Sequence, residues 1–87
     1  MTWRPHAVEW RPDAKRDLRR LDAPVVLRIT RAMERYAATG HGDVKELQGR
    51  VDEWRLRVGD WRVLFRLDHG RLLVIVLRVL PRGSAYR

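Results

Sequence analysis

Residues 54–66 read WRLRVGDWRVLFR, and this stretch decides the fold. Side chains alternate between the two faces of a β-strand, so the aromatic and aliphatic residues fall on one face and the arginines on the other. A turn at Gly59-Asp60 separates the two halves. The stretch therefore predicts a β-hairpin with one buried face and one face that carries a column of arginines.

The arginines of this hairpin are expected to face one another. A two-residue loop places Val58 opposite Trp61 and Arg57 directly opposite Arg62. Like charges that face each other across two strands destabilise a sheet. We therefore expect a polyanion or an acidic protein to bind this face.

Composition limits the class of protein. A chain of 87 residues with 45% hydrophobic content fits a single domain over residues 1–87. The net charge of +8, with arginine at seventeen of nineteen basic positions, favours a nucleic acid, the ribosome or an acidic protein as partner. The chain has no cysteine, no signal-peptide run, and an apolar stretch at 72–77 that is too short for a bilayer. We expect a soluble cytoplasmic protein with no membrane partner.

The remaining sequence predicts two helices before three strands. Apolar residues recur at helical spacing in two segments, and Gly40 is a good helix stop. Residues 40–53 are polar and turn-rich, and the nearly continuous apolar run near the C-terminus predicts a central strand covered on both faces. The expected elements are a strand at 3–10, helices at 12–21 and 25–39, and strands at 54–58, 61–68 and 71–79. This β-α-α-β-β-β order predicts an α+β fold, with a helical hairpin packed on one face of a small antiparallel sheet.

Two other groups of residues, the histidines and Arg78, are not expected to belong to the functional site. His6, His41 and His69 lie at unrelated places without the spacing of metal ligands, so we expect no metal and no cofactor. Arg78 is expected on the helix side, paired with Asp13 or Asp17.

The chain resembles the RelE/ParE superfamily of small bacterial toxins from toxin–antitoxin operons. The resemblance runs over nearly the whole chain, from AKRDLRRLD through KELQG to WRLRVGDWRVLFRL and the final VLPRGSAYR. It implies a RelE-like fold and a toxin that cleaves mRNA, often on the ribosome, and is neutralised by a cognate antitoxin. Operator DNA would be bound only indirectly, through the antitoxin.

The resemblance also implies which residues form the site. By motif, the catalytic residues would be Arg57, Arg62, Arg82 and Tyr86, and Arg55 would bind RNA. We add Lys45 and Arg66 as RNA-binding candidates, with a solvated or salt-bridged surface position as the alternative for Arg66. Two positions depart from the family pattern. Many relatives have lysines where Arg55 and Arg57 stand, and many have a histidine where this chain has Pro81.

The expected reaction is attack of the RNA 2′-hydroxyl on the adjacent phosphate. Guanidinium groups suit the charge that develops on the phosphate, and we assign this role to Arg62 with Arg57, with Arg82 near the leaving oxygen. Tyr86 has two open roles, as the proton acceptor or as a ring that stacks on a base.

Two other functions remain open. A ParE-like toxin would inhibit DNA gyrase by binding and would need no nucleolytic site, and the fold is shared by both classes. A basic RNA-binding module without toxicity would leave Arg82 and Tyr86 unexplained. The arginine column favours the ribonuclease.

Overall fold

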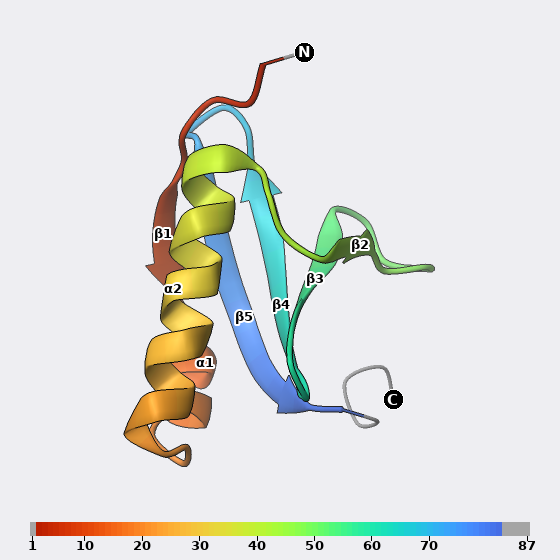
Figure 1. Ribbon diagram of the computed structural model, residues 1–87. Helices are drawn as coiled ribbons and strands as arrows, with labels where there is room; N and C mark the ends of the chain where they lie inside the picture. Colours follow the sequence, from red (N-terminus) through yellow and green to blue (C-terminus); the bar gives the residue numbers. More distant parts are fainter. Residues whose placement is uncertain (1, 83–87) are drawn as a thin grey trace.

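A computed structural model describes residues 2–82 and gives two helices and a sheet of five strands (Figure 1). The α+β class is confirmed. The elements in chain order are β1 (Ala7–Trp10), α1 (Pro12–Leu18), α2 (Ala23–Thr39), β2 (Val44–Glu46), β3 (Glu53–Val58), β4 (Trp61–Asp68) and β5 (Leu73–Pro81).

The sheet is mixed, with the strand order β1-β5-β4-β3-β2. The pairings β5–β4 and β4–β3 are antiparallel, as expected, but β1 runs parallel to β5. The pairing β3–β2 is also antiparallel. The alternation of residue types sets which face a side chain takes and says little about the direction of the partner strand. The polar segment 40–53 also contains a strand, β2, that was not predicted, because three residues are too few to show a period.

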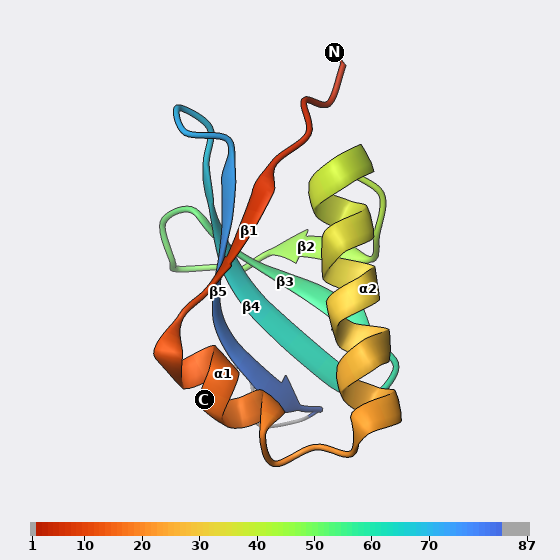
Figure 2. The ribbon, with the colours of Figure 1, turned by 90° about the vertical axis from the view of Figure 1, so that its left-hand side faces the viewer.

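The start of α1 and the end of α2 lie where the sequence predicts them, whereas α1 ends at Leu18 instead of residue 21 and α2 begins at Ala23 instead of residue 25. Pro12 opens α1, and Gly40 ends α2 in the left-handed region with a φ of 77°, where its N–H donates to the Tyr36 carbonyl at 2.7 Å. Figure 2 shows α2 alongside the sheet, with α1 separated from α2. The expected helical hairpin differs in this respect, since α1 packs chiefly against β5.

Asp17 attaches α1 to the edge of β5. Because β1 pairs only with residues 73–76, the N–H of Val79 has no strand neighbour on that side. The Asp17 carboxylate accepts this N–H at 2.8 Å and accepts Arg78 Nε and Nη2 at 2.8 and 3.1 Å, so the predicted pairing of Arg78 is confirmed. Burial raises the pKa of Asp17, but these bonds outweigh it and hold the pKa below its usual value.

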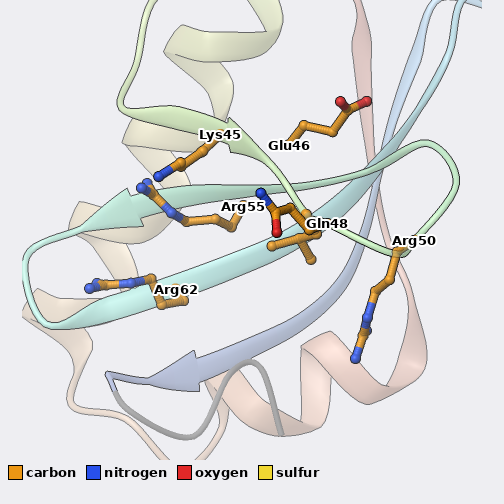
Figure 3. Close-up of a pocket in the computed structure, with 7 residues that line it drawn as sticks. Lys45, Glu46, Gln48, Arg50, Arg55 and Arg62 are labelled. Atoms are coloured by element: carbon orange, nitrogen blue, oxygen red, sulfur yellow. The ribbon is translucent and has the colours of Figure 1, made fainter.

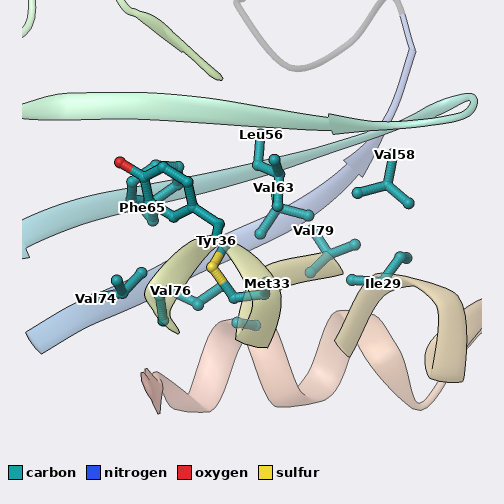
Figure 4. Packing of buried hydrophobic residues seen from close by; sticks show 12 residues of the cluster. Ile29, Met33, Tyr36, Leu56, Val58, Val63, Phe65, Val74, Val76 and Val79 are labelled. Atoms are coloured by element: carbon teal, nitrogen blue, oxygen red, sulfur yellow. The ribbon is translucent and has the colours of Figure 1, made fainter. Parts of the chain in front are cut away.

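The hydrophobic core lies between α2 and the sheet (Figure 4). Its buried side chains come from the inward faces of β3, β4 and β5, from one stripe of α2 and from Ala14 of α1, and the inward residues of β1 and β2 pack against it partly buried. The largest fully buried members are Phe65, Ile29, Met33, Leu56, Val63, Val74 and Val76. Trp54 and Trp61 pack against this cluster, which confirms their expected structural role.

The outer face of β5 is not covered as predicted. Val74, Val76 and Val79 are buried, whereas Leu73, Ile75 and Leu77 on the same strand remain partly exposed. The expectation of a strand covered on both faces is wrong here, because α2 covers only one face of the sheet. Neither helix in the described part of the chain, residues 2–82, is long and apolar enough to cross a membrane.

Candidate functional site

The arginines of the hairpin lie on the face of the sheet that points away from the core. Val58 pairs with Trp61 and Arg57 pairs with Arg62, so the predicted register is confirmed. The core contains Leu56 and Val63 from the same strands, and paired residues of an antiparallel ladder share a face. Arg57 and Arg62 therefore face each other across β3 and β4 on the outer side.

A cavity of about 530 Å³ opens on this face between β2, β3 and β4. Its lining includes three residues that the sequence assigned to RNA, namely Lys45, Arg55 and Arg62, drawn from three different strands. The complete lining is Lys45, Glu46, Leu47, Gln48, Arg50, Arg55 and Arg62.

The cationic groups gather at one end of the cavity (Figure 3). The amino group of Lys45 and the guanidinium groups of Arg55 and Arg62 extend toward the same side, whereas Arg50 points away at the other end. Glu46 is the one acidic residue in the lining, and its carboxylate turns away from the cations. The register explains this orientation, because Glu46 pairs with Trp54, which packs against the core.

Arg55 is the most firmly held of these cations. Its Nη1 donates to the backbone carbonyl of Asp43 at 3.0 Å and to the Asp43 carboxylate at 3.2 Å. Only 15% of its side chain is exposed. The Arg55 guanidinium is thus already paired with Asp43 in the protein, which favours a role in shaping the cavity as well as in binding.

Arg62 is held by neutral groups of its own turn. Its Nη1 lies 3.5 Å from the Gly59 carbonyl and 3.3 Å from the Trp61 carbonyl. Within residues 2–82, neither Arg62 nor Lys45 nor Arg57 forms an ion pair with a carboxylate. These three side chains keep their full charge for an anionic ligand.

Arg66 belongs to a different arrangement. Its Nη2 lies 3.5 Å from Glu53, which also pairs with Arg50 at 3.5 Å. Arg66 lines a second hollow, with Val51 and Asp52, instead of the cavity that holds Arg62. The structure therefore separates Arg66 from the other predicted RNA-binding residues.

Arg82 follows β5 and is fixed to the hairpin turn through its backbone. Its N–H donates to the Asp60 carbonyl at 2.8 Å, next to the pairing of Leu80 with Arg62. The main chain thus brings Arg82 to the same end of the sheet as Arg57 and Arg62. Tyr86, the fourth predicted catalytic residue, lies outside the described residues.

Sequence reasoning missed Gln48 and Arg50. Both line the cavity from the loop between β2 and β3, where Gly49 and Asp52 have positive φ values of 75° and 56°. The polar, turn-rich composition of residues 40–53 indicated a loop, but no periodicity shows which way a loop side chain points. Only the fold places them.

The histidines are less scattered than the sequence suggested. His6 and His69 form an edge-to-face contact with 5.8 Å between ring centroids, and Trp3 stacks on His6 at 4.5 Å. Among residues 2–82, no group of three or more His, Cys, Asp or Glu side chains could hold a metal ion. At the cavity, Lys45, Arg55 and Arg62 supply fixed cations and hydrogen-bond donors.

The chain matches the family of ParE toxins of type II toxin–antitoxin systems over residues 8–86. No curated protein matches the sequence. Among solved structures, the toxin–antitoxin complex RelBE2 from Mycobacterium tuberculosis aligns with a TM-score of 0.79 and 26% identity, covering 93% of this chain and 95% of that one.

Two further complexes show the same fold at lower identity. The RelE–RelB complex from Pyrococcus horikoshii has a TM-score of 0.76 at 24% identity over 98% of this chain and 100% of that chain. The intact RelBE complex from E. coli has a TM-score of 0.74 at 16% identity over 91% and 98%. With the family match over most of its length, the chain belongs to the RelE/ParE family of toxins of type II toxin–antitoxin systems.

Proposed function

We propose that this toxin cleaves messenger RNA, on the ribosome and without a metal ion. The observation that carries the proposal is the group of cations around the outer cavity, where Lys45, Arg55 and Arg62 extend to one side and the lining carboxylate turns away. Such a cavity attracts a phosphodiester and repels cations. The structural similarity to toxins of RelBE complexes is consistent with this reading.

The proposed reaction needs only groups of the RNA and the protein. The 2′-oxygen attacks the adjacent phosphorus while its proton passes to a base, and the bond from phosphorus to the 5′-oxygen breaks as that oxygen receives a proton. The products are a 2′,3′-cyclic phosphate and a 5′-hydroxyl. Charge accumulates on the non-bridging oxygens in the transition state, and preorganised donors stabilise it best.

The arginines divide this work by position. Arg62, held by carbonyls of its own turn, would bind the non-bridging oxygens, and Arg57 across the strand pair would support it. A guanidinium presents its donors in a rigid fork that matches phosphate. Arg82, fixed beside the turn by its backbone bond to Asp60, would lie near the leaving oxygen.

Tyr86 has two alternative roles in this proposal: its phenol accepts the proton of the 2′-hydroxyl, or its ring stacks on a base. Arginine has a pKa above about 12 and accepts protons poorly near neutrality. A Tyr86→Phe variant assayed on translating ribosomes separates the two roles. Cleavage at the native rate would exclude transfer by the phenol and leave the stacking role.

The main test neutralises the cavity. We expect Arg62→Gln to lower the rate of cleavage of mRNA on translating ribosomes by about 10²-fold or more, the scale found for loss of one transition-state donor. Arg71→Gln is the matched control, because it removes the same charge from the β4–β5 loop, where Arg71 pairs with Asp68. Cleavage by Arg62→Gln at the rate of the native toxin would contradict the proposed role of Arg62 in binding the phosphate.

The antitoxin and the cellular setting complete the proposal. The structural neighbours are toxin–antitoxin complexes, which supports a cognate antitoxin for this chain. We propose that an acidic segment of the antitoxin pairs with the cationic face and silences the toxin in the cytoplasm. Binding of operator DNA would come only through the antitoxin.

A second candidate is inhibition of DNA gyrase. It is favoured by the family description, which names a ParE toxin of a parDE system. Pulse labelling after induction distinguishes the candidates, since a ribonuclease stops methionine incorporation first and a gyrase inhibitor stops thymidine incorporation first. An early arrest of DNA synthesis with continued translation would overturn the ribonuclease proposal.

A further inference from the structure

Arg28 of α2 reaches the hairpin turn that carries the proposed site. A Cβ placed on Gly59 would lie 3.0–3.2 Å from the nitrogen and carbon atoms of the Arg28 guanidinium. Arg62 donates to the carbonyl of the same glycine at 3.5 Å. One glycine is thus in contact with two guanidinium groups, one from α2 and one from β4.

The choice of glycine at this position has two physical reasons. Gly59 has a φ of 58°, which a two-residue hairpin turn requires and which other residues adopt with strain. The missing side chain also leaves the space in which the Arg28 guanidinium lies. Figure 2 shows the β3–β4 turn beside the lower part of α2.

Two more arginines continue from Arg28 along the helix. Arg31 and Arg35 follow at i+3 and i+7, a spacing that keeps all three on one side of α2. The span from residue 28 to residue 35 is about 10 Å along the helix axis, comparable with a few consecutive phosphates of a strand. All three side chains are exposed, and none forms an ion pair within residues 2–82.

This arrangement is unfavourable for the isolated protein. Arg28 and Arg31 are three residues apart, and Arg31 and Arg35 are four apart, which are the spacings at which like charges destabilise a helix. An extended polyanion that touches all three would remove the repulsion. The stripe also starts at the turn that bears Arg62, so one polyanion can reach both.

We propose that the RNA-binding surface continues from the cavity around Gly59 onto α2, where Arg28, Arg31 and Arg35 bind phosphates of the RNA strand beyond the cleaved bond. This inference rests on the proposed function and extends its binding surface. Arg28 links the two parts, and Arg31 and Arg35 act only on RNA long enough to leave the cavity.

The test compares a long and a short RNA that cannot be cleaved. Fully 2′-O-methylated single strands of 16 and 5 nucleotides have no free 2′-hydroxyl, so binding is measured apart from catalysis. Arg31→Gln/Arg35→Gln should weaken binding of the 16-mer about tenfold and reduce its salt slope by about 1.4, at roughly 0.7 per phosphate contact. Binding of the 5-mer should not change.

The matched control is Arg16→Gln/Arg71→Gln, which removes two exposed charges elsewhere on the surface. An equal loss in this control, or an unchanged salt slope in the test variant, would overturn the proposal. So would equal affinity of the native toxin for the two lengths. If the test variant keeps its RNA affinity but no longer binds the cognate antitoxin, the arginines of α2 bind the protein partner instead, and the proposal is wrong.

The outcome also separates this inference from the proposed reaction. Length-dependent binding by a toxin that cleaves no RNA on ribosomes would refute the reaction and leave the surface on α2 standing. Cleavage that depends on Arg62, by a toxin whose RNA affinity does not depend on RNA length, would support the reaction and refute the binding surface on α2.

Discussion

The two faces of the β3–β4 ribbon are made by alternate residues of the same strands, yet they have opposite properties. The inner face contributes Val63 and Phe65, which are 0% exposed, to a core shared with α2. The outer face places Arg57 against Arg62 and leaves both without an acidic partner in residues 2–82. The inner face supplies the main core, whereas the outer face combines a small apolar cluster of Leu47, Leu64 and Leu80 with charge that stability alone would not favour.

The largest expected effect comes from the inner face. Phe65→Ala removes a fully buried ring that contacts Tyr36 with 5.2 Å between centroids. We expect the free energy of unfolding, measured by denaturant titration, to fall by about 3–5 kcal/mol. Leu27→Ala is the control, because Leu27 is 48% exposed and its truncation should change stability by less than about 0.5 kcal/mol. Equal losses would mean that the core is not where the structure puts it.

An intermediate effect is expected at the edge of β5. Asp17→Asn replaces a carboxylate that is 10% exposed and accepts bonds from Arg78 and Val79. We expect a loss of about 1–3 kcal/mol in the free energy of unfolding near neutral pH. Asp13→Asn is the matched control, since Asp13 is exposed and forms a surface ion pair with Arg16.

The pH dependence of stability tests the same carboxylate. The pKa of Asp17 is lower in the folded protein than its usual value of 3.8, so the unfolded chain takes up the proton first as the pH falls. The contribution of Asp17 is therefore complete well above pH 3.8 and is lost as the pH falls through the folded pKa. The difference between native and Asp17→Asn stability should shrink over that range. A constant difference would show that the lost bonds do not depend on charge.

Sequence alone could predict the properties that follow from local periodicity. The register at Arg57 and Arg62 follows from a two-residue turn, and the end of α2 follows from Gly40. The pairing of Arg78 with Asp17 also followed, because a charged residue in an apolar strand needs a partner. These predictions use neighbours in the chain or simple charge complementarity.

The features that the sequence did not predict depend on contacts between distant parts of the chain. Nothing in residues 7–10 says that their partner is β5 or that the pairing is parallel. Gln48 and Arg50 line the cavity from a loop with positive φ values at Gly49 and Asp52, and no local sequence pattern predicts the course of this loop. Arg28 reaches Gly59 because α2 crosses the sheet beside the turn, which is a property of the tertiary structure.

The smallest expected effect has the opposite sign. Arg57→Gln removes one member of a like-charged pair and should raise the free energy of unfolding by about 0.2–1 kcal/mol at low salt. Arg66→Gln removes the same charge four residues beyond Arg62 on β4. There Arg66 faces Glu53, pairs with it at 3.5 Å and is 55% exposed. This substitution should lower stability by up to about 1 kcal/mol.

Salt distinguishes repulsion from other causes of this gain. The Debye length falls from about 10 Å at 0.1 M to about 3 Å at 1 M, so both differences should shrink toward zero in 1 M NaCl. If Arg57→Gln instead weakened the fold at low salt, the two guanidinium groups would not repel each other. The outer face would then need no polyanion to relieve it, and the argument from the sequence to an RNA ligand would lose its first step.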